Sequence, residues 1–209
     1  MRKEKNYPLA IQYYQQAIHY NKIDHEVYAN LANVYFDLQK PDSAFLYYQK
    51  ALGLKADYYP ALDNMAAMFA VIGRYDSSLV YDSLALKIKP DYAVAYRNSG
   101  FTHLQLRMYE KAIYDFEKYL QYSSDSELDA RADAYSDIGI SYQGLGKYQE
   151  SLAPINKAIE MTGSPVYFLN RSYSYNGLKN MEQARADALT AKQKGIKIPD
   201  DYARTLGIQ

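Results

Sequence analysis

Residues 27–51 read VYANLANVYFDLQKPDSAFLYYQKA, and this stretch alternates small and bulky side chains in a fixed order. The same order returns along most of the chain, where Ala10, Ala44, Ser78 and Ala112 are each 34 residues apart. A fixed period of roughly 20–50 residues is typical of a repeat array, in which each unit packs only against its neighbours. The sequence therefore predicts stacked copies of one supersecondary unit.

Each period contains two segments whose apolar residues recur at helical spacing. Gly73 lies in one of the turns, where a left-handed backbone conformation ends a helix. Pro90 closes that pair, because a proline cannot continue a helix. The predicted helices cover residues 7–21, 25–38, 42–54, 59–72, 76–88, 93–106, 110–122, 149–161, 166–177 and 181–194.

An insertion interrupts the period within residues 123–133, where one step is 39 residues instead of 34. Ser124 and Glu127 have the spacing of a capping box. We therefore predict that the next helix starts early and covers about 125–145. The alternative is a longer loop before a helix of ordinary length.

Small residues recur where paired helices would have to approach closely. On the first helix of each pair they are Ala32, Ala66, Gly100, Gly139 and Ser172. On the second helix they are Ala10, Ala44, Ser78, Ala112, Ser151 and Ala184, and a second set is Ala17, Ala51, Ala85, Ala158 and Ala191, with Tyr119 as the exception. One bulky column is Tyr35, Phe69, His103, Tyr142 and Tyr175, and another is Tyr7, Tyr75, Tyr109 and Tyr148.

These columns resemble the tetratricopeptide repeat (TPR) family, whose helix–turn–helix unit of about 34 residues carries the same alternation. The likeness covers nearly the whole chain, and phrases such as AYRNSGF and FLNRSYSYNGLKN resemble bacterial members. The resemblance implies an all-α protein, a right-handed α-solenoid of antiparallel helix pairs. This TPR superhelix would contain about five full repeats, a leading half-repeat and a C-terminal capping helix.

We expect residues 1–209 to form a single solenoid domain. A solenoid needs a cap because its last repeat would otherwise expose an apolar face. The expected parts are a half-repeat at 7–22, repeats at 25–56, 59–90, 93–124, 125–163 and 165–196, and a capping helix at 199–207.

Composition argues against several classes of protein. Lys+Arg and Asp+Glu both total 24, so the chain lacks the basic surplus of a typical nucleic-acid-binding protein. The absence of cysteine excludes a disulfide framework or a thiolate metal site. No apolar run approaches the ~18 residues of a membrane span. These features leave a cytoplasmic and a periplasmic location equally open.

We expect no enzymatic activity, no metal and no cofactor. The histidines His19, His25 and His103 are scattered, and His103 falls in a core column, where packing is its simplest role. Gly144 and Gly146 fit a turn between helices better than a loop that cradles phosphate.

The candidate binding site lies on the first helices, which line the concave face in proteins that resemble this one. One inward column is rich in asparagine, whose amide offers a donor and an acceptor to the backbone of an extended peptide. The alternative is that these asparagines hold adjacent helices together by hydrogen bonds. The candidate peptide-binding residues are Asn30, Asn33, Asp63, Asn64, Arg97, Asn98, Phe101, Asp137, Asn170 and Tyr173.

The sequence therefore predicts a non-enzymatic scaffold that binds a peptide or a partner protein on its concave face. The alternative is a structural or self-associating module of a larger assembly or regulator. In that case the apolar face of the half-repeat, with Ile11, Tyr14 and Ile18, would join a second copy of the chain. Neither a nucleic-acid partner nor a membrane span is expected.

Overall fold

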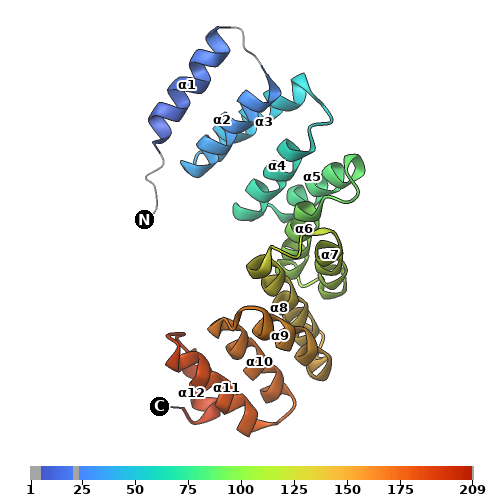
Figure 1. Cartoon of the computed structure of the whole chain (residues 1–209), viewed down its shortest axis with the longest axis vertical. Coiled ribbons are helices and arrows are strands. Elements are labelled where there is room, and N and C mark those ends of the chain that lie inside the picture. The colour runs from blue at the N-terminus through green and yellow to red at the C-terminus, as the bar shows by residue number, and fades with distance from the viewer. Residues whose placement is uncertain (1–5, 21–23, 209) are drawn as a thin grey trace. The chain divides into compact units, whose positions relative to one another are not determined.

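A computed structural model of the chain describes residues 6–20 and 24–208, and within these ranges it contains α-helices and no strand (Figure 1). The chain forms two compact units, residues 1–98 and 99–209. The boundary lies inside α6 (Ala93–Gln105). The expected all-α architecture is confirmed, while the single solenoid over 1–209 and its handedness stay predictions.

The first unit consists of α1 to α5 and the beginning of α6. Their bounds are α1 (Tyr7–His19), α2 (His25–Asp37), α3 (Pro41–Leu54), α4 (Tyr59–Val71) and α5 (Tyr75–Ile88). Helix α2 packs against α3, and α4 packs against α5, as the two-helix period predicts (Figure 1). The predicted half-repeat extends to residue 22, and residues 21–23 lie outside the described part of the chain.

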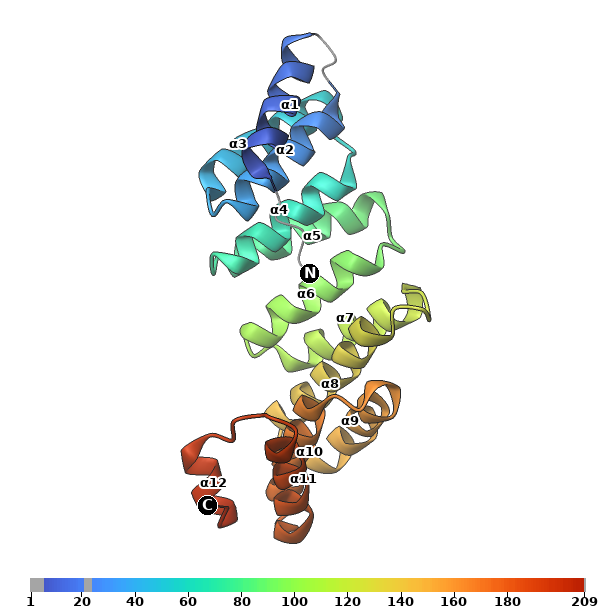
Figure 2. The same cartoon turned by 60° about the vertical axis from the view of Figure 1, so that its left-hand side comes forward.

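The second unit contains two further complete pairs and a short last helix. The bounds are α7 (Tyr109–Tyr122), α8 (Leu128–Gly144), α9 (Tyr148–Thr162), α10 (Pro165–Gly177), α11 (Met181–Gln193) and α12 (Asp200–Leu206). Figure 2 shows α8 beside α9 and α10 beside α11. The capping helix is confirmed, because Tyr202 and Leu206 of α12 are buried in a cluster with Ala188 and Ala191 of α11.

The columns of small residues form the contact between paired helices. Ala32 and Ala66 on first helices, like Ala44 and Ala112 on second helices, have no exposed surface. Gly139 shows how close the approach is, since a Cβ atom there would lie 2.3 Å from a side-chain carbon of Ile155. Small residues at these positions therefore let the backbones of a pair come together.

One turn position has a left-handed backbone in every complete repeat. The residues are Gln39, Gly73, Arg107, Gly146 and Lys179, with φ of 58°, 76°, 58°, 72° and 62°. The position follows the end of the first helix and reverses the chain into the second helix. Only two of these residues are the glycines that such a conformation favours.

The insertion is divided between a longer helix and a loop. Helix α8 has 17 residues, compared with 13 in α2, α4, α6 and α10. The expectation of a longer first helix is thus right, but its predicted start near 125 is wrong, because α8 begins at Leu128. The N–H of Ser124 donates to Glu127 Oε1 at 3.2 Å, but this bond lies in the loop. The predicted capping box is therefore wrong, because the N-cap of α8 is Glu127 and its side chain makes no capping hydrogen bond.

Arg131 of α8 anchors this loop to the end of α7. Its Nη1 donates to the carbonyl of Leu120 and to the hydroxyl of Ser123, both at 2.8 Å. Tyr119, the bulky exception in a small column, donates its hydroxyl to Glu127 at 3.2 Å. The inserted segment therefore contacts the one oversized residue of that column.

Candidate functional site

The asparagine column connects the first helices of successive repeats. Asn98 Nδ2 of α6 donates to Asp63 Oδ1 of α4 at 2.9 Å. Asn170 Nδ2 of α10 donates to Ser136 Oγ of α8 at 2.8 Å. In both cases the amide contacts the first helix of the preceding repeat. Its partner lies one position before the equivalent residue of that helix, since Asp63 precedes Asn64 and Ser136 precedes Asp137. Asn98 and Asn170 therefore hold adjacent helices together by hydrogen bonds, which is the alternative role given above for the asparagines.

Asp63 is the most unusual titratable group among the candidate residues. Its side chain is only 4% exposed, and it also accepts a bond from the Tyr92 hydroxyl at 3.3 Å. Burial raises the pKa of Asp63 to about 6, although the bonds from Tyr92 and Asn98 and the charge of Arg97 act in the opposite direction. The Asp63 carboxylate therefore accepts hydrogen bonds that connect α4 to the segment around α6 within the first unit.

The other asparagines of the first unit differ in how their amides are used. Asn33 accepts a hydrogen bond from the hydroxyl of Tyr48, so its oxygen is occupied within one repeat. Asn64 is half-buried and makes no hydrogen bond with the described part of the chain. Asn30 is exposed and likewise makes none there. Two amides therefore remain available to a ligand on this face.

The structure divides the candidate residues between the two units. Asn30, Asn33, Asp63, Asn64, Arg97 and Asn98 belong to the first unit, and Phe101, Asp137, Asn170 and Tyr173 belong to the second. In the second unit, Phe101 is 47% exposed. Tyr173 packs against Tyr202 of α12 with ring centroids 4.2 Å apart, and burial raises its pKa. Each unit therefore presents its own part of the candidate surface.

Gln143 of α8 is a polar residue that sequence reasoning missed. Its Nε2 donates to the carbonyl of Asn170 and to the hydroxyl of Ser174 on α10, both at 2.7 Å. Its column was a possible signal, because Phe36 and Leu104 occupy the equivalent positions of earlier repeats. A polar residue in a column that is apolar in all the preceding repeats often has a specific partner.

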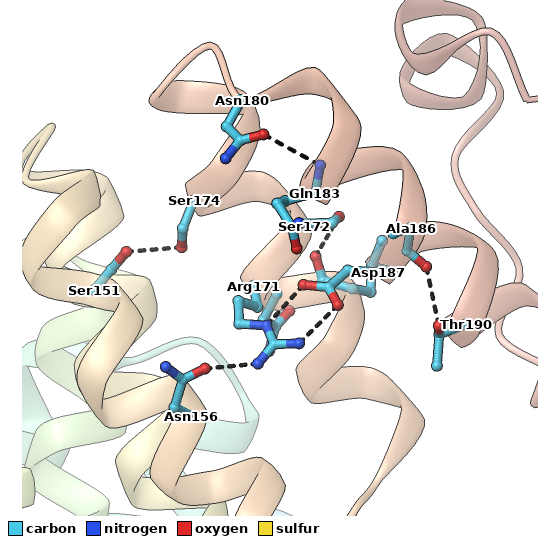
Figure 3. A network of polar contacts seen from close by, with 12 residues as sticks. Ser151, Asn156, Arg171, Ser172, Ser174, Asn180, Gln183, Ala186, Asp187 and Thr190 are labelled. Carbon is cyan, nitrogen blue, oxygen red and sulfur yellow. Dashed lines mark hydrogen bonds and ion pairs between the residues drawn. The ribbon is translucent and has the colours of Figure 1, made fainter.

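Arg171 organises a second network that the sequence did not reveal. Its guanidinium binds both carboxylate oxygens of Asp187 on α11, at 2.7 and 2.8 Å, and donates to Asn156 on α9 at 2.7 Å (Figure 3). The ion pair raises the pKa of Arg171. Because the carboxylate is buried and all these groups are paired, the network ties three helices together and leaves no free reactive group.

His103 also has a structural partner. Its Nδ1 lies 2.7 Å from Asp115 Oδ2, and both side chains are largely buried between α6 and α7. Within the described ranges, no group of three or more His, Cys, Asp or Glu side chains is arranged to hold a metal ion.

Within residues 6–20 and 24–208, no helix has both the length and the apolar character needed to cross a membrane.

Comparison with known proteins agrees with this geometry. A model of the tetratricopeptide repeat matches residues 25–58. The small glutamine-rich tetratricopeptide repeat-containing protein of Dictyostelium discoideum is 32% identical over 89 residues, which is 42% of this chain and 26% of that relative's length. The chain is therefore similar to the tetratricopeptide repeat family, by sequence over residues 25–58 and by fold over most of its length.

Solved TPR structures show the same fold at low sequence identity. The solved part of MamA of Desulfovibrio magneticus RS-1, from its residue 41 to the end, superimposes with a TM-score of 0.74 at 18% identity, covering 81% of this chain and 93% of that chain. YrrB, described as a TPR protein with an unusual peptide-binding site, gives a TM-score of 0.71 at 21% identity, covering 85% and 90% of the two chains. Members of the TPR family bind protein partners, and the family and its fold are typically non-enzymatic.

Proposed function

We propose that this TPR protein acts by binding, without catalysis, and that it holds an extended segment of a partner protein on the face formed by its first helices. The observation that carries the proposal is Asn64, a half-buried amide of α4 without a hydrogen-bond partner among the described residues. A half-buried amide that is not bonded within the chain bonds to water, and a bound peptide can take the place of that water. The backbone of a bound peptide supplies both a donor and an acceptor.

Other candidate residues offer binding groups within their own units. Asn98 and Asn170 use their amide nitrogens between helices, and their Oδ1 atoms make no hydrogen bond with the described part of the chain. These oxygens can accept from the N–H groups of a peptide. Phe101 offers exposed aromatic surface to a side chain of the ligand. In this arrangement main-chain bonds supply affinity and side-chain contacts supply selectivity.

A photo-cross-linking experiment tests the proposal. A benzophenone amino acid is placed at Asn64, and the matched control carries it at Gln49, an exposed position of the second helix α3. We expect irradiation with a lysate of the source cells to give a discrete adduct from position 64 and none from position 49. Equal yields at both positions, or none at 64, would contradict binding on the first-helix face.

Asn98 is a poor site for this test. Its replacement removes a bond to the buried Asp63 carboxylate, so a loss of binding would be mixed with a loss of stability. Asn64 has no such bond within the described residues. A substitution of Asn64 by alanine therefore separates binding from folding more cleanly than a double substitution of both asparagines.

As a second candidate we propose self-association through α1. No residue of α1 is buried: Ala10 and Ala17 are half-exposed, whereas their equivalents Ala44 and Ala51 have no exposed surface. Small residues seven positions apart lie on one face and allow another helix to approach closely. The α1 helix of a second copy presents the same small residues and can pack against this face.

The oligomeric state tests this second candidate. We expect sedimentation of the full chain to show a concentration-dependent dimer, and we expect Ala10→Lys to shift the equilibrium towards the monomer. The matched control is Gln12→Lys, an exposed position of the same helix. A wild-type chain that stays monomeric at high concentration would contradict the candidate.

A further inference from the structure

The second unit contains a pocket at the C-terminal ends of its first helices. Its volume is about 380 Å³. Tyr173 is one of the candidate residues of the first helices, so the pocket adjoins the second unit's part of the candidate surface. The residues that line it are Tyr109, Ile140, Gln143, Gly144, Tyr148, Tyr173, Asn176 and Gly177.

Two walls of the pocket are tyrosines that rest on glycines of the next repeat. A Cβ atom on Gly144 would lie 2.3 Å from the ring of Tyr109, and one on Gly177 would lie 2.4 Å from the ring of Tyr148. Any larger residue at either glycine would displace the ring. The absence of side chains at these two positions therefore sets where the rings lie.

The third aromatic wall is fixed from behind by the capping helix. Tyr173 packs against Tyr202, whose hydroxyl lies 3.1 Å from Ser172 Oγ. Gln143 is held by its two bonds to α10. The pocket thus has walls with defined positions before any ligand arrives, which lowers the entropic cost of binding.

The chemistry of the lining limits the class of ligand. Three of the side chains are tyrosines and none is charged. The hydroxyls of Tyr109, Tyr148 and Tyr173, like the amide of Asn176, make no hydrogen bond with the described part of the chain. The pocket therefore offers aromatic faces and several hydrogen-bond donors to a neutral ligand.

We propose that this pocket receives a proline-rich segment in the polyproline II conformation. Proline rings pack well on aromatic faces, and grooves lined by aromatic residues are a recurrent way of recognising such segments. A proline has no backbone N–H, so the segment presents carbonyl acceptors without matching donors. The tyrosine hydroxyls and the Asn176 amide supply donors of the required kind. The inference rests on the proposed function and specifies its ligand.

Fluorescence anisotropy with the full chain tests the ligand class. The probes are fluorescein-labelled acetyl-hexaproline amide, an alternating Leu–Ser hexapeptide and an alternating Gly–Ser hexapeptide. We expect hexaproline to bind about tenfold or more tightly than the other two, a difference that corresponds to the packing of one or two rings on aromatic walls. Equal binding of the Leu–Ser peptide, or no binding of hexaproline, would overturn the inference.

Matched variants locate the binding. Asn176→Ala and Tyr148→Phe each remove one donor without removing an aromatic wall, and we expect each to weaken hexaproline binding by about three- to tenfold. Tyr114→Ala is the control, because Tyr114 of α7 is 55% exposed and does not line the pocket. Unchanged affinity in both donor variants, with unfolding curves like those of the wild type, would place hexaproline elsewhere.

The result of the anisotropy experiment can be distinguished from the result of the cross-linking test. Asn64 lies in the first unit, while the pocket lies in the second. A discrete adduct at position 64 together with no hexaproline binding would reject the ligand class and leave the proposed function intact. Failure at position 64 would remove the proposed function itself.

Discussion

Asp115 and His103 form a buried polar pair, with 2.7 Å between Asp115 Oδ2 and His103 Nδ1. The equivalent residues one repeat earlier are Tyr81 and Phe69, whose rings stack with centroids 5.4 Å apart. A hydrogen-bonding couple has thus taken the place of an aromatic couple between the same two helix positions. Because both residues of the pair differ between the two repeats, the polar groups bond to each other in one repeat and the aromatic rings stack on each other in the other.

This relationship predicts coupled effects of substitution. His103→Phe alone leaves the buried Asp115 without its partner, and we expect it to lower the free energy of unfolding by about 1–3 kcal/mol. The double variant His103→Phe, Asp115→Tyr restores the stacked couple and should lose less than the sum of the two single variants. Urea unfolding of all four proteins gives the coupling energy. Additive losses would show that the two positions do not act as a pair.

Asp63 predicts a pH dependence of opposite sign to that of most carboxylates. Its pKa rises from 3.8 to about 6 in the folded protein, so the folded state binds more protons between these values. Its contribution to stability is therefore fully present below about pH 4 and is lost as the pH rises through 6.

The Asp63→Asn variant isolates that contribution, because the amide oxygen still accepts from Asn98 but does not titrate. We expect the difference in unfolding free energy between variant and wild type to shift in favour of the variant by about 2–3 kcal/mol from pH 4 to pH 7. Urea unfolding at a series of pH values measures this difference. A difference that is constant over this range would contradict the buried, shifted carboxyl.

The turn position with left-handed backbone predicts stabilising glycines. Arg107 and Lys179 adopt φ of 58° and 62°, which costs a residue with a Cβ atom about 1 kcal/mol relative to glycine. We expect Arg107→Gly and Lys179→Gly each to raise the free energy of unfolding by about 0.5–1 kcal/mol, measured by thermal melting. The reciprocal change Gly73→Ala should lower it by a similar amount. Destabilisation by both glycine variants would argue against a strained turn.

Two helical glycines predict opposite effects of the same substitution. Gly139→Ala would place a methyl group 2.3 Å from Ile155 and 3.2 Å from the carbonyl of Ser151, so we expect a loss of about 1–3 kcal/mol. Gly53 of α3 has no atom within 4 Å of the added carbon. Gly53→Ala should therefore gain about 0.5–1 kcal/mol from helix propensity. Chemical unfolding of both variants checks the pair, and equal effects would contradict the close approach at Gly139.

The Arg171–Asp187 pair predicts a large cost when one partner is removed. Asp187 is only 6% exposed, so Arg171→Met leaves a buried carboxylate without its counter-charge and should cost about 3 kcal/mol or more. The double variant Arg171→Met, Asp187→Leu removes both charges and should recover most of that loss. Unfolding in urea measures both variants, and no recovery would show that Asp187 does not depend on Arg171.

The sequence by itself determined the helical pairs, their turns and the capping helix. Ala44 and Ala112 recur in phase with Tyr35 and Phe69, and such a pattern depends only on helical spacing and on the need for small residues at close contacts. It also showed that His103 and Tyr119 depart from their columns. Both departures have partners in the structure, His103 in Asp115 and Tyr119 in Glu127.

Only the tertiary structure decided which polar residues remain available for binding. Asn64 and Asn98 occupy the same column, yet Asn98 bonds to Asp63 while Asn64 has an alanine, Ala29, at the corresponding position. The bond depends on how far one repeat is offset from the next, which brings together side chains that are 35 residues apart. Local periodicity contains no information about that offset, and the same reason explains why the tyrosine pocket around Gly144 and Gly177 could not be foreseen.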